Sequence, residues 1–167
     1  KELNVDLAAG VHFDKTYDGD ANVTQTLSKG TNYTLTNFVT GEGAGITLDE
    51  TVRGQYADKN AGADKAVKFA GLTLAGEGAA NYKLNTTTLA GTGTIAQKEL
   101  TLTADAKSAE QGKPVPAFTG SAAGFVSGED ASVFGADGVI FASAADTSAV
   151  GRYAVMGKAG GVSDGIS

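Results

Sequence analysis

Asp14, Asp18 and Asp20 lie close together in residues 14–20, DKTYDGD, and together they can offer several carboxylate oxygens to one cation. Hard cations such as Ca²⁺ are bound by such oxygens. The stretch also has a structural interpretation, because Asp18-Gly19 is a strong turn signal and the ring of Tyr17 can cover the end of a thin core. No EF-hand loop and no second copy of this carboxylate set occurs in the sequence. We therefore favour the turn over the metal site.

His12 is the only histidine, and the chain has no cysteine. A transition-metal site needs several such ligands, so we expect His12 to be an ordinary strand residue. A serine hydrolase would need His12 as its base beside an orienting carboxylate, and the sequence has no Gly-x-Ser-x-Gly turn. We expect no catalytic residue, no cofactor and no enzyme activity.

Lys15, Lys59 and Lys107 each lie near Asn or Asp residues, which raises the hypothesis of an intramolecular lysine–asparagine cross-link. Such a bond needs a buried lysine with a neighbouring acid. Another motif, Asp146 followed by Gly151-Arg152-Tyr153, resembles the corner before a strand in sandwich folds, where a tyrosine hydroxyl bonds to nearby backbone. For Tyr153 we therefore expect a structural role.

The elements that position these residues form a repeated architecture. The first sign of the repeat is KEL at 1–3, which recurs at 98–100. Further matches follow in the same order: Lys15 aligns with Lys107, and Val67 aligns with Val155. We interpret the chain as two tandem units, 1–97 and 98–167. The second unit has no counterpart of residues 81–97, so we expect it to lack its last strand or strands. The junction AQKELTL predicts a strand that runs from one unit into the next and a rod-like arrangement.

Apolar residues alternate with polar ones in short runs, as strands with one buried face require. Leu100 and Leu102 alternate with threonines, and Tyr153-Ala154-Val155 has the same pattern. Glycines separate the runs, and Pro114 and Pro116 exclude a central strand between them. The expected core positions are Val67, Phe69, Leu72, Leu74, Leu100 and Leu102, and the expected corner residues are Tyr17, Tyr82 and Tyr153.

The expected fold class is mainly β, with two small antiparallel domains. Each is either an immunoglobulin-like sandwich or a β-grasp-like arrangement, with at most short helical turns at 77–81 and 127–134. Glycine makes up 24 of the 167 residues and aromatic residues only 7%, so each core must be thin. The start at Lys1, without a signal peptide, is expected of a mature segment or a fragment.

The net charge of −6 argues against nucleic acid and against anionic lipid as partners. No apolar run approaches the length of a membrane span, so membrane insertion is not expected. The absence of cysteine excludes disulfides, and it fits both a cytosolic protein and a bacterial surface protein that crosses a membrane unfolded.

Five motifs carry a family resemblance: TYDGD (16–20), NYTL (32–35), YADKNAGADKAV (56–67), GLTLAGEGAANYKL (71–84) and GTGTI (91–95). They resemble the YDG-type repeats of large bacterial secreted adhesins, of the filamentous-haemagglutinin and two-partner-secretion kind. The second unit, from LTLTADAKSAEQGKPVPAFTG (100–120), resembles the glycine-rich, mostly-β MBG repeats. It departs from them where Ala109-Glu110-Gln111-Gly112 replaces the usual Tyr-Gly-Asp.

The resemblance implies a structural stalk or adhesion module of a bacterial cell-surface or secreted adhesin, acting as a mechanical spacer in cell adhesion and biofilms. Its partners would be neighbouring repeats of the parent chain, in an extracellular location. The alternative is a module that binds a host-surface or matrix glycan or protein directly. The scarcity of aromatic residues weakens the case for sugar.

Overall fold

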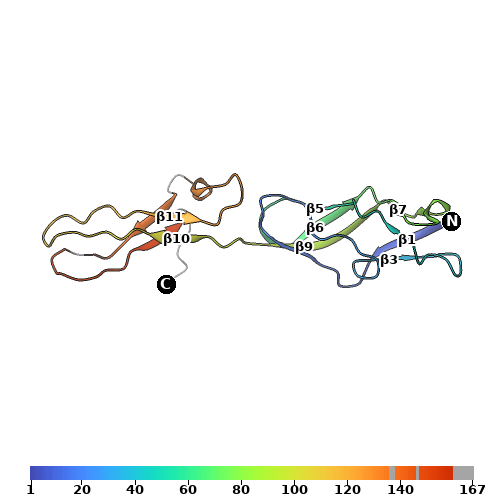
Figure 1. Cartoon of the computed structure of the whole chain (residues 1–167), viewed down its shortest axis with the longest axis horizontal. Coiled ribbons are helices and arrows are strands. Elements are labelled where there is room, and N and C mark those ends of the chain that lie inside the picture. Colours follow the sequence, from blue (N-terminus) through green and yellow to red (C-terminus); the bar gives the residue numbers. More distant parts are fainter. Residues whose placement is uncertain (136–137, 146, 160–167) are drawn as a thin grey trace. The chain divides into compact units, whose positions relative to one another are not determined.

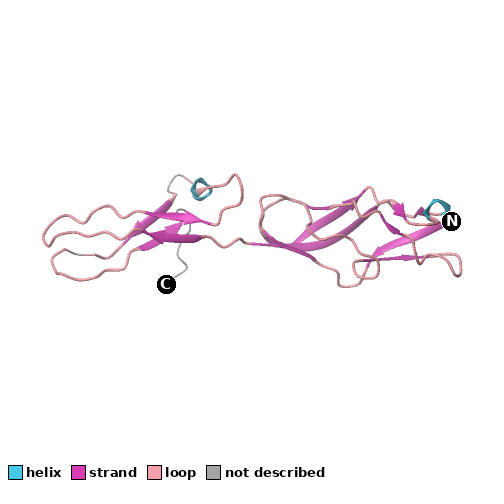
Figure 2. Cartoon of the chain, viewed as in Figure 1, coloured by secondary structure: helices cyan, strands magenta, loops and turns pink. Residues whose placement is uncertain are grey.

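The computed structural model describes residues 1–135, 138–145 and 147–159, and the chain divides into two units, Lys1–Gln97 and Lys98–Ser167 (Figure 1). The fold class is mainly β, as predicted. Within the described ranges the helical structure consists of two 3-10 turns, η1 (Ala79–Asn81) and η2 (Ala131–Phe134). Both fall inside the segments where a helical turn was predicted (Figure 2).

The first unit contains three sheets. Its strands are β1 (Glu2–Leu7), β2 (Phe13–Thr16), β3 (Tyr33–Thr36), β4 (Thr47–Leu48), β5 (Gly54–Tyr56), β6 (Gly62–Ala70), β7 (Leu74–Ala75), β8 (Lys83–Leu84) and β9 (Thr88–Ala96). The largest sheet has the order β2-β9-β6-β5, a second has the order β3-β1-β8, and β4 pairs with β7.

Two strand pairs correct the prediction of purely antiparallel domains. β2 runs parallel to β9, with Phe13 opposite Gly93 and Thr16 opposite Ala96. β1 runs parallel to β8, with Glu2 opposite Lys83. Alternation of apolar and polar residues has the same period in both orientations, so it carries no information on strand direction. Each parallel pair closes over a long crossover that contains most of the unit.

The core of the first unit follows the predicted alternation. Val67 and Phe69 are buried on β6, while Lys68 between them is exposed. Leu72 is buried and Leu74 is partly buried, as expected of core positions. The buried hydrophobic residues are Leu3, Val5, Phe13, Val23, Leu27, Tyr33, Leu35, Ile46, Leu48, Tyr56, Val67, Phe69, Leu72, Leu89 and Ile95.

The described residues of the second unit form two antiparallel pairs. β10 (Thr101–Ala104) pairs with β11 (Gly120–Ala123), and β12 (Val139–Ala142) pairs with β13 (Met156–Ala159). Leu100 and Leu102 are half-buried whereas Thr101 and Thr103 are exposed, which confirms the predicted alternation. Among the described residues of this unit no hydrophobic side chain is fully buried.

Other predictions for the second unit are wrong in detail. Tyr153-Ala154-Val155 lies outside the strands, and the predicted strand through the junction is interrupted, because residues 97–100 separate β9 from β10. The residues paired by the repeat also differ in structure, since Val67 is a buried strand residue and Val155 is a half-buried loop residue. The stretch around Pro114 and Pro116 contains no strand, as predicted. Asp137 and Asp146 lie outside the described residues.

Candidate functional site

The DKTYDGD motif begins on β2, where strand alternation places Phe13 and Lys15 on the same face. Phe13 is fully buried in the core. Lys15 extends from the edge of that core, and its side chain is only 3% exposed. A lysine is seldom buried to this degree unless its charge is paired. The surroundings of its ammonium group therefore define the candidate site.

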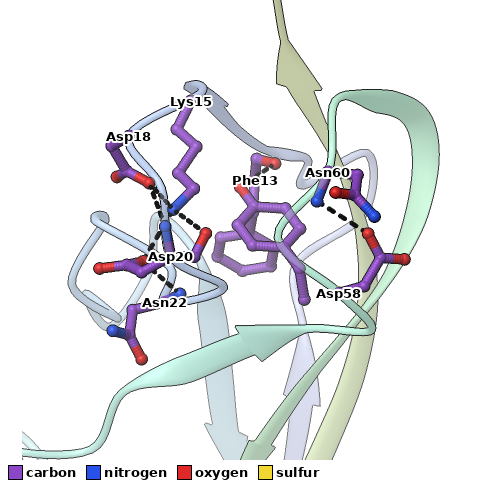
Figure 3. A network of polar contacts seen from close by, with 8 residues as sticks. Phe13, Lys15, Asp18, Asp20, Asn22, Asp58 and Asn60 are labelled. Carbon is purple, nitrogen blue, oxygen red and sulfur yellow. Dashed lines mark hydrogen bonds and ion pairs between the residues drawn. The ribbon is translucent and has the colours of Figure 1, made fainter. Parts of the chain in front are cut away.

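Two carboxylates and a carbonyl hold the Lys15 ammonium group (Figure 3). Its Nζ lies 2.6 Å from Oδ1 of Asp18, 3.0 Å from Oδ1 of Asp20 and 3.0 Å from the backbone oxygen of Asp20. Nζ also lies 5.6 Å from the centroid of the Tyr56 ring, within range of a cation–π interaction. An ammonium group has three N–H donors, and three oxygens accept them here.

The same carboxylates fold the loop that follows β2. Oδ1 of Asp18 accepts the amide of Asp20 at 3.2 Å, and Oδ1 of Asp20 accepts the amide of Asn22 at 2.7 Å. Gly19 has a φ of 92°, a conformation that glycine adopts without strain. Asn22 then forms an isolated antiparallel bridge with Gln55 next to β5. The loop is thus fixed at both ends.

This loop is a turn but not a hairpin. The Asp18-Gly19 pair is typical of two adjacent antiparallel strands, yet β2 pairs in parallel with β9. The loop bridges to Gln55 of β5 through Asn22 and then continues to β3. Tyr17 is half-buried and packs against the core, and its amide donates to Ala96 at 2.8 Å. The Asp-Gly signal marked the turn correctly, but it carries no information on which strand comes next.

Electrostatics favour a charged clamp over reaction chemistry at Lys15. Burial lowers the pKa of Lys15, but hydrogen bonds and charge from Asp18 and Asp20 outweigh it and leave the pKa above its ordinary value. The Asn22 amide and Lys15 hold the pKa of Asp20 below its ordinary value. A cross-link requires a neutral amine as nucleophile, and this arrangement keeps the amine protonated. The other two lysines of that hypothesis, Lys59 and Lys107, are exposed.

Asp14, the third carboxylate of the possible metal site, forms different contacts. Its Oδ1 lies 2.6 Å from Nδ1 of His12 and accepts the amide of Thr94 at 2.9 Å. Partial desolvation raises the pKa of Asp14, but the hydrogen bonds from His12 and Thr94 outweigh it and hold the pKa below its ordinary value. Across residues 1–135, 138–145 and 147–159, no group of three or more His, Asp or Glu side chains is placed to hold a metal ion.

His12 has carboxylate neighbours. Besides Asp14, its Nε2 lies 3.8 Å from Oδ1 of Asp64. In the part of the chain that the structure describes, these two carboxylates are the polar contacts of the imidazole. A hydrolytic triad also needs a hydroxyl beside the ring, and none of these contacts provides one.

A second polar turn lies between β5 and β6, in the YADKNAGADKAV motif. Oδ1 of Asp58 accepts the amide of Asn60 at 2.8 Å (Figure 3). It also accepts the ammonium of Lys65 at 2.7 Å. These two groups hold the pKa of Asp58 below its ordinary value, with Lys65 as the larger cause. Both acidic stretches, around Asp18-Asp20 and around Asp58, therefore act as turn supports in which a lysine neutralises the carboxylates.

The remaining structural residues of the sequence prediction lie as follows. Tyr82 is partly buried, its ring contacts Phe38 edge to face at 5.6 Å, and its hydroxyl donates to the Glu42 carboxylate. Tyr153 is 42% exposed, and its hydroxyl lies 3.5 Å from the backbone oxygen of Ala149. A tyrosine that bonds to upstream backbone was predicted at this corner.

Sequence reasoning missed two buried tyrosines that connect separate elements. The Tyr56 hydroxyl donates to the carbonyl of Phe13 at 2.8 Å, and the Tyr33 hydroxyl accepts the amide of Leu48 at 2.7 Å. Burial raises the pKa of both. Each tyrosine belongs to a motif noted in the sequence, NYTL or YADKNAGADKAV. A buried tyrosine usually needs a partner for its hydroxyl, and that rule is the signal that would have identified them.

Comparison with known proteins gives two family matches. The model of the YDG domain matches residues 1–90, and the model of the MBG domain (YGX type) matches residues 100–164. No curated protein and no solved structure matches the chain. None of the helical segments in the described ranges is long and apolar enough to cross a membrane.

Proposed function

The chain belongs to the YDG domain family through residues 1–90, with an MBG domain (YGX type) over residues 100–164, and on this premise we propose that it is a stalk module of a large bacterial adhesin. YDG and MBG domains are repeat-type domains, consistent with a repeat module of a larger protein. In the proposed role the module is a mechanical spacer at the bacterial surface or in a secreted fibre, its partners are neighbouring repeats, and it is not an enzyme.

The observation that carries this proposal is the parallel pairing of early and late strands in the first unit. In a repeat array, tension enters this unit near residue 1 and leaves it near residue 97. Because β2 and β9 are parallel, such tension pulls them in opposite directions along their length. The hydrogen bonds between them are then loaded together, in shear, and none can break much before the others. The β1–β8 pair is loaded in the same sense.

Lys15 adds to this resistance. It lies on β2, and its contacts with Asp18 and Asp20 join the end of β2 to the loop that bridges to β5 at Asn22. On the other side of the same strand, the Asp14 carboxylate accepts the amide of Thr94 on β9. The Asp14 contact therefore joins β2 directly to β9, whereas the Lys15 contacts hold the loop that follows β2.

Single-molecule pulling tests the proposal, and the absence of cysteine makes attachment sites easy to introduce. In the whole chain, handles at K1C and Q97C load the β2–β9 pair in shear. Handles at Q25C and Q97C instead pull on the same end of both strands and open the pair one bond at a time. We expect a clearly higher unfolding force for the first pair of handles. Equal forces, or a higher force for the second pair, would contradict a spacer built on this pairing.

The alternative function is direct binding of a glycan or protein by the same module. The observation that favours it is the incomplete burial of apolar side chains in the second unit, where Tyr153 and Val150 are exposed. A glycan array tests the sugar version. Reproducible hits that disappear in a Tyr153→Ala variant would support binding, and an array without hits would leave the protein version.

A further inference from the structure

The two units differ in how far their apolar side chains are buried. The buried hydrophobic residues of the described chain all lie between Leu3 and Ile95. In the second unit several large apolar side chains are exposed: Val115, Val133, Ile140, Val150, Tyr153 and Met156. Since exposed apolar side chains that gather in one place often mark a binding surface, their arrangement is informative.

Three of these residues, Val115, Val150 and Tyr153, line one groove. It is formed by two long segments outside the strands, residues 106–118 between β10 and β11 and residues 143–155 between β12 and β13 (Figure 2). Its volume is about 470 Å³. The described part of both segments contributes to the lining.

Hydrogen bonds near the tips hold the two segments together. The amide of Gly112 donates to the carbonyl of Thr147 at 3.0 Å, and the Thr147 hydroxyl donates to the carbonyl of Lys113 at 2.7 Å. The Gln111 side chain donates to the carbonyl of Ser148 at 3.0 Å. At the other end, the segments continue into the paired strands. The groove is therefore bounded at both ends and is a formed feature of the unit.

The walls of the groove combine apolar side chains with backbone that lies outside the strands. Pro116 and Phe118 line one wall and Val155 lines the other, together with the exposed residues named above. Val150 is 88% exposed, which is extreme for a valine. Pro114 and Pro116 carry no amide hydrogen, so the first wall has few donors where they lie. Residues 149–155 contain no proline, and that wall offers both donors and acceptors to an extended chain.

Two cationic side chains line the described part of the groove. The charged residues in its lining are Lys107 and Arg152, and no carboxylate lines it among the described residues. None of the described hydrogen bonds or ion pairs involves either side chain. An occupant with a carboxylate complements the groove, and a cationic occupant does not.

We propose that this groove binds an extended acidic peptide segment of a partner protein. Apolar side chains of the peptide pack between Val115, Phe118 and Val155, and a carboxylate of the peptide pairs with Lys107 and Arg152. The backbone of the peptide bonds to residues 149–155, in the manner of a strand added to an open edge. The apolar lining favours a peptide over an acidic glycan, which would need more polar groups. The proposal is independent of the spacer function, because it concerns only the second unit.

Fluorescence anisotropy with designed peptides tests this proposal on the whole chain. The probe is a labelled peptide of four Val-Glu repeats, and the matched peptides are four Val-Lys repeats and eight consecutive glutamates. We expect saturable one-to-one binding of the Val-Glu peptide and no saturable binding of the Val-Lys peptide. Binding of the all-glutamate peptide as tightly as the Val-Glu peptide would overturn the proposal, since it would show attraction of charge alone.

Variants locate the binding. Arg152→Gln and Lys107→Gln should each weaken binding about fivefold or more, as expected for the loss of one charge pair in a partly dry site. Val150→Ser, a change at an exposed position that leaves folding intact, should also weaken it. Lys113→Gln is the control, because its side chain lies on the same segment but does not line the groove. Equal binding by all four variants and the unchanged chain would overturn the proposal. So would saturable binding of an acidic oligosaccharide that the Val-Glu peptide does not displace.

Discussion

The phenyl rings of Phe13 and Phe69 contact each other across the middle strand of the largest sheet, with centroids 4.9 Å apart and planes at 55°. Phe13 lies on β2 and Phe69 on β6, and β9 runs between these strands. The contact forms because β9 has glycines where side chains would intervene. A Cβ at Gly91 would lie 3.2 Å from the Phe13 ring, and a Cβ at Gly93 would lie 1.8 Å from the Phe13 carbonyl oxygen. The GTGTI motif therefore makes space for the aromatic core.

Gly93→Ala should destabilise the first unit by about 1–3 kcal/mol, because the new methyl group meets backbone and forces β2 away from β9. Urea unfolding, with hydrogen exchange of the β9 amides as the local measure, tests this. Gly45→Ala is the control, since a Cβ there meets nothing within 4 Å. Equal stability of the two variants would mean that β2 does not pack on β9 at this register.

Phe69→Ala should cost about 3–5 kcal/mol, the range for a fully buried phenylalanine. The neighbouring Lys68→Ala, on the exposed face of the same strand, should change stability by less than about 0.5 kcal/mol. Calorimetry of both variants measures the difference. A loss below about 1 kcal/mol for Phe69→Ala would contradict the position of β6 in the core.

Lys15→Met should destabilise the first unit by about 1–2 kcal/mol. The methionine fills similar space, but the carboxylates of Asp18 and Asp20 lose their cation, and their partial exposure limits the cost. Amides of the loop after β2 should exchange faster in this variant. Lys83→Met is the matched control, because Lys83 pairs with Glu2 at an open surface and should contribute little. Equal effects of the two substitutions would show that burial of Lys15 has no energetic consequence.

The stability of the first unit should depend on pH in two separate ranges. The pKa values of Asp20 and Asp58 are lowered in the fold, so their stabilisation is present above about pH 4 and is lost as the pH falls through the folded values. The pKa values of Lys15, Tyr33 and Tyr56 are raised, so their stabilisation is present below about pH 10 and is lost as the pH rises further.

Melting temperatures from about pH 2 to about pH 12 test this dependence. Asp20→Asn should reduce the acid loss. Lys15→Met should reduce the alkaline loss but retain the part due to the tyrosines. A melting temperature that stays constant below about pH 4 would contradict the carboxylate contacts described for the first unit.

Calcium should not stabilise the first unit, because the oxygens of Asp18 and Asp20 already hold the Lys15 ammonium and Asp14 contacts His12 instead. Thermal melts with millimolar CaCl₂ and with a chelator should coincide. In the Lys15→Met variant the two carboxylates are released, and a small calcium response there would fit the same geometry. A saturable rise in melting temperature of the unchanged chain would restore the metal interpretation.

Burial along single strands could be predicted from the sequence. The alternation of Val67, Lys68 and Phe69 predicted which side chains face the core and which face solvent, because successive side chains of a strand point to opposite faces of the sheet. The two 3-10 turns were also predictable, since each has acidic or small residues before apolar ones. For Leu100 and Leu102 the face was right, although both are only half-buried.

Strand partners could not be predicted in the same way. Phe13 pairs with Gly93, and nothing in the local sequence around either residue indicates this pairing. The role of Lys15 was equally hidden. In the sequence, a lysine between two aspartates is typical of a charged surface. Its side chain becomes buried only when β2 packs beside β9 in the folded unit. Tyr153-Ala154-Val155 shows the opposite error. These residues alternate, but no strand among the described residues pairs with them.

The pairing of β1 with β8 also dictates when the first unit can fold. The amide of Val5 bonds to the Asn85 side chain, and the amide of Thr94 bonds to Asp14, each across 80 positions of the chain. During synthesis or passage through a narrow pore, β1 and β2 must wait for nearly the whole unit to emerge before their parallel partners β8 and β9 exist. Such a high contact order slows folding and keeps the emerging segment open until a late, cooperative closure.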